Sequence, residues 1–312
     1  MNITNIKDTN CYMIDFSYIL YRSYYSLKNF AVELEGGLKR PTGHIVGVLS
    51  TIMNLIDYDE NAYIFLCLDG YPLYRKELCE SIGVGYKADR TKPDYNIKAD
   101  TDLICNLLMH IPNVYVVEND EAESDDLMFA LSRHLDKSNK CFIYTGDRDL
   151  LQAINENTSI ITGWKNSKPI IITQDSYTSD ETLYKKFRAC QPDKLPFYRA
   201  FVGDSSDNLK GVYRMNKDFA CQLATIMQSI DDIDNAKTNF GYLATTPNKL
   251  KLLSQIQDEY HNIIKVNYEI MKLHDNWDYT ITRDLVSIKE IIEAFKLNKF
   301  KYWLSKYHIK II

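Results

Sequence analysis

The chain has 312 residues, with 37 basic and 42 acidic side chains and a formal net charge of −5. A hydrophobic content of 45% and a charged content of 25% are typical of a globular protein of one or two domains, and exclude a disordered or collagen-like chain. No apolar run reaches the roughly 18 residues of a membrane span, and the polar start lacks a signal peptide, so we expect a cytoplasmic protein.

The seven cysteines are odd in number and widely spaced, and no CxxC motif occurs. This pattern favours reduced, mostly buried thiols over a disulfide framework. The absence of a basic excess argues weakly against a nucleic-acid partner, because phosphate binding usually shows as surplus Lys and Arg.

Short, continuous apolar runs predict buried parallel strands at 11–16, 62–69, 114–117 and 140–147. Segments with helical apolar spacing lie between them, at 42–56, 101–111 and 124–135. Two further runs within 158–173 predict a hairpin or a sheet edge. The alternation predicts an α/β domain with a mainly parallel sheet flanked by helices, over residues 1–175.

After residue 175 the pattern changes, and the sequence predicts a helical part over residues 176–312. The segments 176–191, 196–203, 219–230 and 247–273 have helical character, and residues 286–309 are amphipathic. We expect no further strand after 173. The boundary is a shift in composition rather than a Gly/Ser linker, so the two parts can pack closely.

Three of the predicted strands end in an aspartate: Asp15, Asp69 and Asp147. The carboxyl ends of parallel strands share one edge of a sheet, where α/β proteins bind ligands. Six further acids lie in short motifs that follow predicted strands or helices: Glu123, Asp125, Asp126, Asp149, Asp204 and Asp207.

Each acidic motif also has a purely structural explanation. Acids in a first helical turn complement the helix dipole, Asp after a strand can cap a helix, and GDSSDN is good turn chemistry. Together, however, carboxylates at one sheet edge repel one another, and divalent cations relieve that repulsion. Oxygen-only ligands favour Mg²⁺ or Mn²⁺ over zinc, and a site for about two Mg²⁺ ions suits phosphodiester hydrolysis.

Seven motifs in order, over about residues 11–225, resemble the 5′-nuclease family, which includes flap endonucleases, bacterial 5′→3′ exonucleases and the T-even phage ribonuclease H. MIDFSYILYRSYY resembles the family's first strand and helix, and RPTGHIVGVLSTI and LCLDGYPLYRKEL its next two segments. GYKADR resembles its Tyr-Lys-x-x-Arg motif. EAESDDLMFAL, TGDRDLLQAI and VGDSSDNLKGV resemble its three later acidic motifs, with Ser124 in place of the usual Ala.

The resemblance implies a PIN-like 5′-nuclease core with a helical arch, and roles for the motif residues. The ion nearer the scissile phosphate would be held by Asp15, Asp69, Glu123, Asp125 and Asp126. A second ion would be held by Asp147, Asp149, Asp204 and Asp207, partly through water. Lys87 and Arg90 would polarise the scissile phosphate from the base of the arch, so that the catalytic set is Lys87, Arg90, Asp15 and Asp69. Nucleic-acid contacts are implied for Arg22, Thr42, Tyr86, Lys87, Arg90, Arg214 and Lys217.

The sequence departs from the family after GDSSDN, where a glycine-rich hairpin between two helices usually holds a monovalent cation. Here Arg214, Met215 and Asn216 stand where glycines are expected. Non-glycine residues resist positive φ and keep the backbone from phosphate, which argues against a K⁺ site and predicts a divergent helix-hairpin-helix. Duplex contact would then use side chains such as Arg214 and Lys217.

The sequence therefore predicts a Mg²⁺-dependent, structure-specific 5′ nuclease, with Mn²⁺ as a substitute. We expect it to act near 5′ ends of flaps, nicks or RNA–DNA duplexes, as a monomer of a bacterial cell or a phage-infected host, in contact with single-stranded-DNA-binding or replication proteins. One alternative is a non-catalytic homologue that binds branched DNA. Another is a phosphatase of the haloacid-dehalogenase type, although Phe16 and Ser17 follow Asp15 where that class needs a second Asp.

Overall fold

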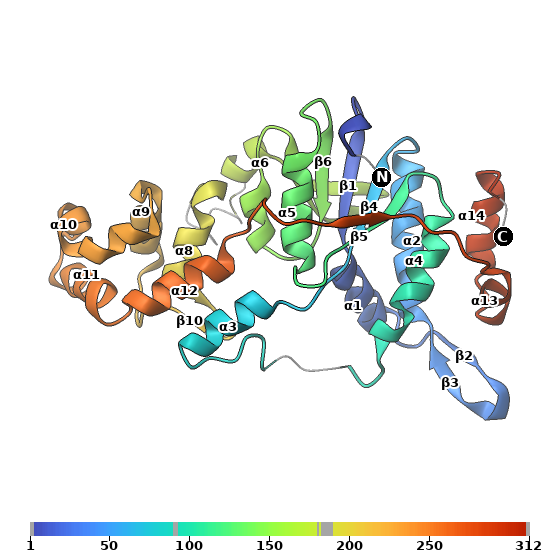
Figure 1. Ribbon diagram of the computed structural model, residues 1–312, viewed down its shortest axis with the longest axis horizontal. Helices are drawn as coiled ribbons and strands as arrows, with labels where there is room; N and C mark the ends of the chain where they lie inside the picture. Colours follow the sequence, from blue (N-terminus) through green and yellow to red (C-terminus); the bar gives the residue numbers. More distant parts are fainter. Residues whose placement is uncertain (1–2, 90–92, 180, 182–189, 310–312) are drawn as a thin grey trace.

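A computed structural model describes residues 3–89, 93–179, 181 and 190–309. Its centre is a seven-stranded sheet in the order β11-β5-β4-β1-β6-β7-β8 (Figure 1). The five strands from β5 to β7 run parallel, and β11 and β8 are antiparallel at the two edges. The bounds are β1 Asn10–Asp15, β4 Tyr63–Cys67, β5 Val114–Glu118, β6 Lys140–Tyr144, β7 Thr158–Lys165, β8 Lys168–Ile172 and β11 Thr280–Thr282.

Alternate residues of the central strand point into two separate cores, because successive side chains in a strand face opposite sides of the sheet. Cys11 and Met13 join the core that contains α5 (Ser124–His134). Tyr12 and Ile14 join the core on the other face. The helices of that second face are α1 Phe16–Ser26, α2 Gly43–Tyr58 and α4 Thr101–Met109.

The helical half of the chain extends the first core away from the sheet, as Figure 1 shows in yellow and orange. Apolar residues of α8, α9, α11 and α12 pack in the same cluster as Met13. A small ribbon of β9 (Gly203–Asp204) and β10 (Leu209–Lys210) connects α8 to α9. The helices are α6 Gln174–Ser179, α8 Leu195–Val202, α9 Lys217–Ile226, α10 Ala236–Phe240, α11 Pro247–Asp258 and α12 His261–Met271.

The chain then returns to the sheet. After α12, strand β11 pairs with β5, with Ile281 opposite Val117. The last two helices, α13 (Lys289–Ala294) and α14 (Asn298–Lys306), pack with Phe300 and Trp303 on the second core, beside α2 (Figure 1).

The structure confirms the predicted α/β class, all four buried strands, the 158–173 hairpin and the helices at 42–56, 101–111 and 124–135. All seven cysteines are free and buried, as expected. The expectation of no strand after 173 was wrong, because β9 and β10 form a small ribbon and β11 completes one edge of the sheet. Part of 176–191 lies outside the described residues, and the division at residue 175 stays a prediction.

Two segments of the N-terminal half were not anticipated. Strands β2 (Ala31–Glu33) and β3 (Lys39–Pro41) form an exposed ribbon, seen projecting from the body in Figure 1. Helix α3 (Leu73–Ser81) follows β4 and precedes the segment that carries Lys87. Beyond it, residues 82–89 and 93–96 form turns and coil, with no helix in this described stretch before Ile97. No helix in the described ranges is both long and apolar enough to cross a membrane.

Candidate functional site

Asp15 lies at the carboxyl end of the central strand and is fixed from both sides. Its Oδ1 accepts a hydrogen bond from the Tyr18 backbone N–H at 2.9 Å, which caps α1. Its Oδ2 accepts one from the Thr145 hydroxyl, just after β6, at 2.8 Å. The two bonds hold this carboxylate between two neighbouring strand ends, where the sequence predicted it.

Asp69, two residues beyond β4, connects three elements of the same edge. Its Oδ1 accepts from the Ser124 backbone N–H, at the start of α5, at 2.9 Å. Its Oδ2 accepts from the Ser17 hydroxyl in α1. Despite burial, these hydrogen bonds hold the pKa of Asp69 below its usual value, so it stays ionised.

Asp15, Asp69, Asp125 and Asp147 form a group at this edge, which we call the acidic group. Burial, reinforced by Asp69, raises the pKa of Asp15 to about 7. Burial, together with Asp147 and Asp15, raises the pKa of Asp125 well above its usual value. Like charges in a partly dry site raise one another's pKa in this way. A divalent cation would relieve the repulsion, so an all-oxygen donor set of this charge fits Mg²⁺ or Mn²⁺.

The acidic group is not a fully formed coordination sphere. Across the described ranges, no three Asp, Glu, His or Cys side chains converge closely enough to hold a metal ion. Cation binding would therefore require side-chain rearrangement within the group.

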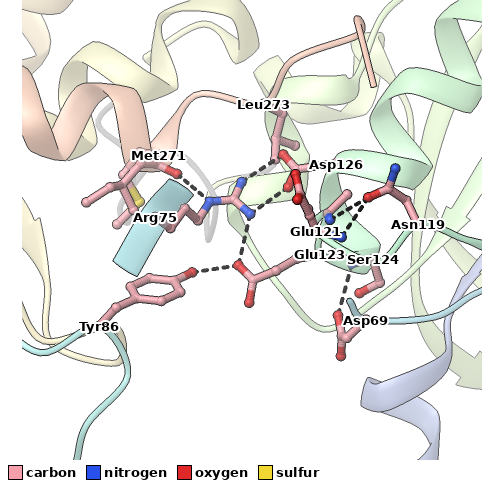
Figure 2. A network of polar contacts seen from close by, with 12 residues as sticks. Asp69, Arg75, Tyr86, Asn119, Glu121, Glu123, Ser124, Asp126, Met271 and Leu273 are labelled. Atoms are coloured by element: carbon pink, nitrogen blue, oxygen red, sulfur yellow. Dashed lines mark hydrogen bonds and ion pairs between the residues drawn. The ribbon is translucent and has the colours of Figure 1, made fainter. Parts of the chain in front are cut away.

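Glu123 lies next to the acidic group and accepts hydrogen bonds from three side chains, of which Figure 2 shows Tyr86 and Arg75. Its Oε2 accepts from the Tyr86 hydroxyl at 2.7 Å and from Arg75 Nη1 at 2.9 Å, and its Oε1 accepts from Lys87 Nζ at 2.7 Å. Burial opposes ionisation of Glu123, yet Lys87 and Arg75 hold its pKa below the usual value. Glu123 thus fixes the segment after α3 against α5.

Asp126 faces away from the acidic group toward Arg75, which Figure 2 shows between α3 and α5. Arg75 Nη1 and Nη2 lie 2.6 and 2.8 Å from the two carboxylate oxygens, and only 1% of Asp126 is exposed. Arg75 Nε also donates to the Ile270 carbonyl in α12. The structure therefore gives Asp126 a cationic partner, where the sequence predicted a metal ligand.

The second predicted ligand set is divided between two places. Asp149 and Asp204 share Arg199 of α8, whose Nε lies 2.7 Å from Asp149 Oδ1. Asp147 connects to this pair through the Asp149 N–H, which donates to Asp147 Oδ1 at 2.9 Å. Asp207 lies instead beside the segment after α3, where its carbonyl accepts from the Lys87 N–H at 3.4 Å.

The predicted nucleic-acid residues have different surroundings. Arg22 is exposed and its Nη1 donates to the Tyr144 hydroxyl at 3.0 Å. Arg214 and Lys217 are also exposed. Thr42 and Tyr86 are only 4% and 9% exposed, so neither side chain presents a free surface. Arg90 lies outside the described residues.

The loop between β10 and α9 differs from the expectation in one respect. Arg214 adopts a positive φ of 58°, in the left-handed region that glycine favours. A non-glycine residue at this position therefore does not prevent a left-handed backbone conformation. Beside this loop lies a cavity of about 580 Å³, whose lining includes Arg199, Asp204, Lys210 and Lys217. Asp204, a member of the second predicted ligand set, thus lines this cavity.

Arg75, Arg199, Ser17 and Thr145 were not predicted from the sequence. A charged residue inside an apolar helical run, as in PFYRAFV around Arg199, is the pattern that could have indicated a buried ion pair. Ser17 and Thr145 have no comparable pattern, because ordinary hydroxyls acquire their role only from the positions of Asp69 and Asp15.

Comparison with known proteins places this architecture among nucleases. Residues 10–195 match the family described as 5′-3′ exonuclease, N-terminal resolvase-like domain. The chain therefore belongs to the 5′-3′ exonuclease family, within the 5′-nuclease group that the motifs resemble. This membership favours a nuclease over the phosphatase alternative, whose second Asp is replaced here by Ser17.

Curated relatives match over nearly the whole chain. A 5′-3′ exonuclease of Aquifex aeolicus is 26% identical over 304 residues, covering 96% of this chain and 92% of the relative. One of Mycoplasma genitalium is 27% identical over 303 residues, covering 95% and 97%. Among solved structures, the bacteriophage T5 5′-exonuclease with bound divalent zinc has a TM-score of 0.58 at 15% identity, covering 84% of this chain and 89% of its own. The catalytic core of Rad2 with DNA substrate has a TM-score of 0.53 at 12% identity, covering 95% and 89%.

Proposed function

We propose that the protein is a Mg²⁺-dependent, structure-specific 5′ nuclease that hydrolyses phosphodiesters near the 5′ ends of flaps, nicks or RNA–DNA duplexes. The observation that carries the proposal is the acidic group, which gathers carboxylates from three strand ends and α5, and in which burial and neighbouring carboxylates raise the pKa values of Asp15 and Asp125. Such a group gains stability from a bound divalent cation. Divalent ions bound to the T5 5′-exonuclease and DNA bound to Rad2 support the same reading.

Asp15, Asp69, Asp125 and Asp147 would hold the cation near the scissile phosphate, with Glu123 beside them. The bound ions would supply an activated water and charge stabilisation of the leaving oxygen. Mn²⁺ would substitute, since it accepts the same oxygen ligands. Asp149, Asp204 and Asp207 would contribute to a second cation position.

The chain's own cations would orient the phosphate. Lys87 Nζ donates to Glu123 Oε1 at the edge of the acidic group. From this position it can also donate to a phosphate oxygen. A cation placed where phosphoryl charge develops favours the transition state. Arg90 would add a second donor, while Arg22, Arg214 and Lys217 are exposed for the DNA backbone. Tyr86 and Thr42, being buried, would act by supporting the site.

The test uses a 5′-labelled flap and an RNA-primed duplex, each with Mg²⁺ or EDTA, and compares the wild type with Asp147→Asn. We expect 5′-terminal cleavage that requires Mg²⁺ and falls by orders of magnitude in the variant. Equal cleavage in EDTA would contradict the metal-dependent mechanism. Binding of the flap without cleavage would instead establish the non-catalytic homologue, and phosphate release from small monoesters with intact DNA would establish the phosphatase.

A further inference from the structure

Arg199 projects from α8 between two acids of the second predicted ligand set. Its Nε and Nη2 lie 2.7 and 3.2 Å from the two carboxylate oxygens of Asp149, and Nη2 also contacts Asp204 Oδ2. The three side chains are mostly buried, with 18%, 16% and 11% of the Arg199, Asp149 and Asp204 side chains exposed. A guanidinium in this geometry is a strong, oriented partner for carboxylates.

Every carboxylate oxygen of this pair already has a donor. Arg199 occupies both oxygens of Asp149 and one of Asp204. The remaining oxygen, Asp204 Oδ1, accepts from the Ser206 backbone N–H at 2.8 Å and from its hydroxyl at 2.7 Å. A divalent cation can coordinate Asp149 and Asp204 directly only by displacing these donors.

The acidic group differs in this respect. Within the described ranges, no Arg or Lys forms an ion pair with Asp15, Asp69 or Asp125. Its negative charge is thus left for an external cation, whereas Arg199 neutralises one of the two charges of Asp149 and Asp204. The two predicted cation positions are therefore unequal.

The cavity beside Arg199 gives its guanidinium room to move. The cavity has a volume of about 580 Å³, and Lys210 and Lys217 also line it. An anion drawn into it by these cations would attract the guanidinium away from the carboxylates. Displacement of Arg199 is thus compatible with substrate occupying this side of the site.

We propose that Arg199 is a built-in competitor for the second divalent cation: in the free protein it takes that cation's place between Asp149 and Asp204. Only one cation then binds tightly, at the acidic group, and the second binds when the guanidinium leaves. This inference rests on the proposed metal-dependent function and specifies how that site loads its cations.

The test measures Mn²⁺ binding to the metal-free full chain, by calorimetry and by the electron paramagnetic resonance signal of free Mn²⁺. We expect one tight site in the wild type and a second that is at least tenfold weaker. Arg199→Gln removes the charge and should tighten the second site at least tenfold. Arg199→Lys keeps the charge and should stay close to the wild type.

Two further variants locate the effect. Arg283→Gln removes the same charge from an exposed arginine whose Nε donates to the Met109 carbonyl, and should leave both affinities unchanged. Arg199→Gln combined with Asp149→Asn should lose the tightened site. Circular dichroism and thermal unfolding in saturating Mn²⁺ establish whether each variant is folded. If Arg199→Gln does not fold, the comparison is made with Arg199→Lys.

Two equally tight sites in the wild type would overturn the proposal. So would an unchanged second site in folded Arg199→Gln, or, if that variant is unfolded, a tightened second site in Arg199→Lys. The proposed nuclease function is judged separately by the flap assay. A wild type that fails to cut DNA but shows the expected Mn²⁺ behaviour would contradict the function and leave the role of Arg199 supported.

Discussion

Arg75 and Asp126 form a buried bidentate ion pair, with nitrogen–oxygen distances of 2.6 and 2.8 Å, that joins α3 to α5. Because Arg75 also contacts Glu123 and the Ile270 carbonyl, this pair connects the segment that carries Lys87 to both halves of the molecule. The conformation of the segment that carries Lys87 therefore depends on Arg75, which contacts Glu123 and Asp126.

Removing one partner of this pair should destabilise the fold strongly. Arg75→Gln leaves Asp126 as an unpaired buried charge, and such losses cost ~3–5 kcal/mol. We expect Arg75→Gln and Asp126→Asn each to lower the free energy of unfolding by about 3 kcal/mol in urea titrations. Lys237→Gln, which removes an exposed pair with Asp258, should cost under about 1 kcal/mol. Similar losses at the two pairs would contradict the buried-pair interpretation.

Neutralising one member of the acidic group should stabilise the metal-free protein. Burial and repulsion raise the pKa of Asp125, so its ionised form is unfavourable without a cation. Asp125→Asn should raise the unfolding temperature in EDTA and remove most of the additional stabilisation that Mg²⁺ provides. Differential scanning fluorimetry with and without Mg²⁺ measures both effects. Asp284→Asn, at an exposed acid beyond β11, should change neither quantity.

The stability contributed by Asp100 should depend on pH. Burial opposes its ionisation, but His44, Arg40 and the Tyr95 hydroxyl together hold its pKa below the usual value. A lowered pKa stabilises the fold above the unfolded value near ~3.9, and the gain disappears as pH falls through the folded pKa. Asp100→Asn should therefore cost ~2 kcal/mol at pH 7 and much less near pH 2–3, in urea unfolding. A constant loss across this range would rule out the ionised role.

Gly47 permits the close contact between α1 and α2. An added Cβ would lie 2.5 Å from both Cβ and Oγ of Ser23. Overpacking of this kind costs ~1–3 kcal/mol, against a helix-propensity gain of at most ~1 kcal/mol. We expect Gly47→Ala to destabilise the protein in chemical unfolding, and Ser23→Gly to restore part of the loss. Gly241→Ala meets no atom within 4 Å and should be nearly neutral.

The parallel strands could be predicted from sequence because each is buried on both faces and reads as a continuous apolar run, as in β1 and β6. Strand β11 could not, because it has only three residues, Thr280–Thr282, and is a strand only because the edge of β5 is available to it. The ribbon of β2 and β3 could not be predicted either, because its strands have three residues each and are mostly exposed.

The acids of the site could be identified from motifs, but their partners could not. The sequence gives Asp126 and Asp149 the same status as Asp15, whereas the fold pairs the first two with Arg75 and Arg199. Which carboxylate meets an arginine depends on how α3 and α8 pack, and these helices are far from their partners in sequence. Whether a carboxylate is paired with an arginine or is left for a cation thus depends on the tertiary structure.

The position of β11 has a consequence for folding during synthesis. The edge of β5 is exposed until about 160 more residues have left the ribosome, since Thr282 pairs back to Val116. A nascent chain that stops after α12 presents an uncovered strand edge, which is a template for association with other chains. Ribosome-bound chains ending near residue 275 should therefore be recognised by chaperones and cut by proteases more readily than chains that include β11.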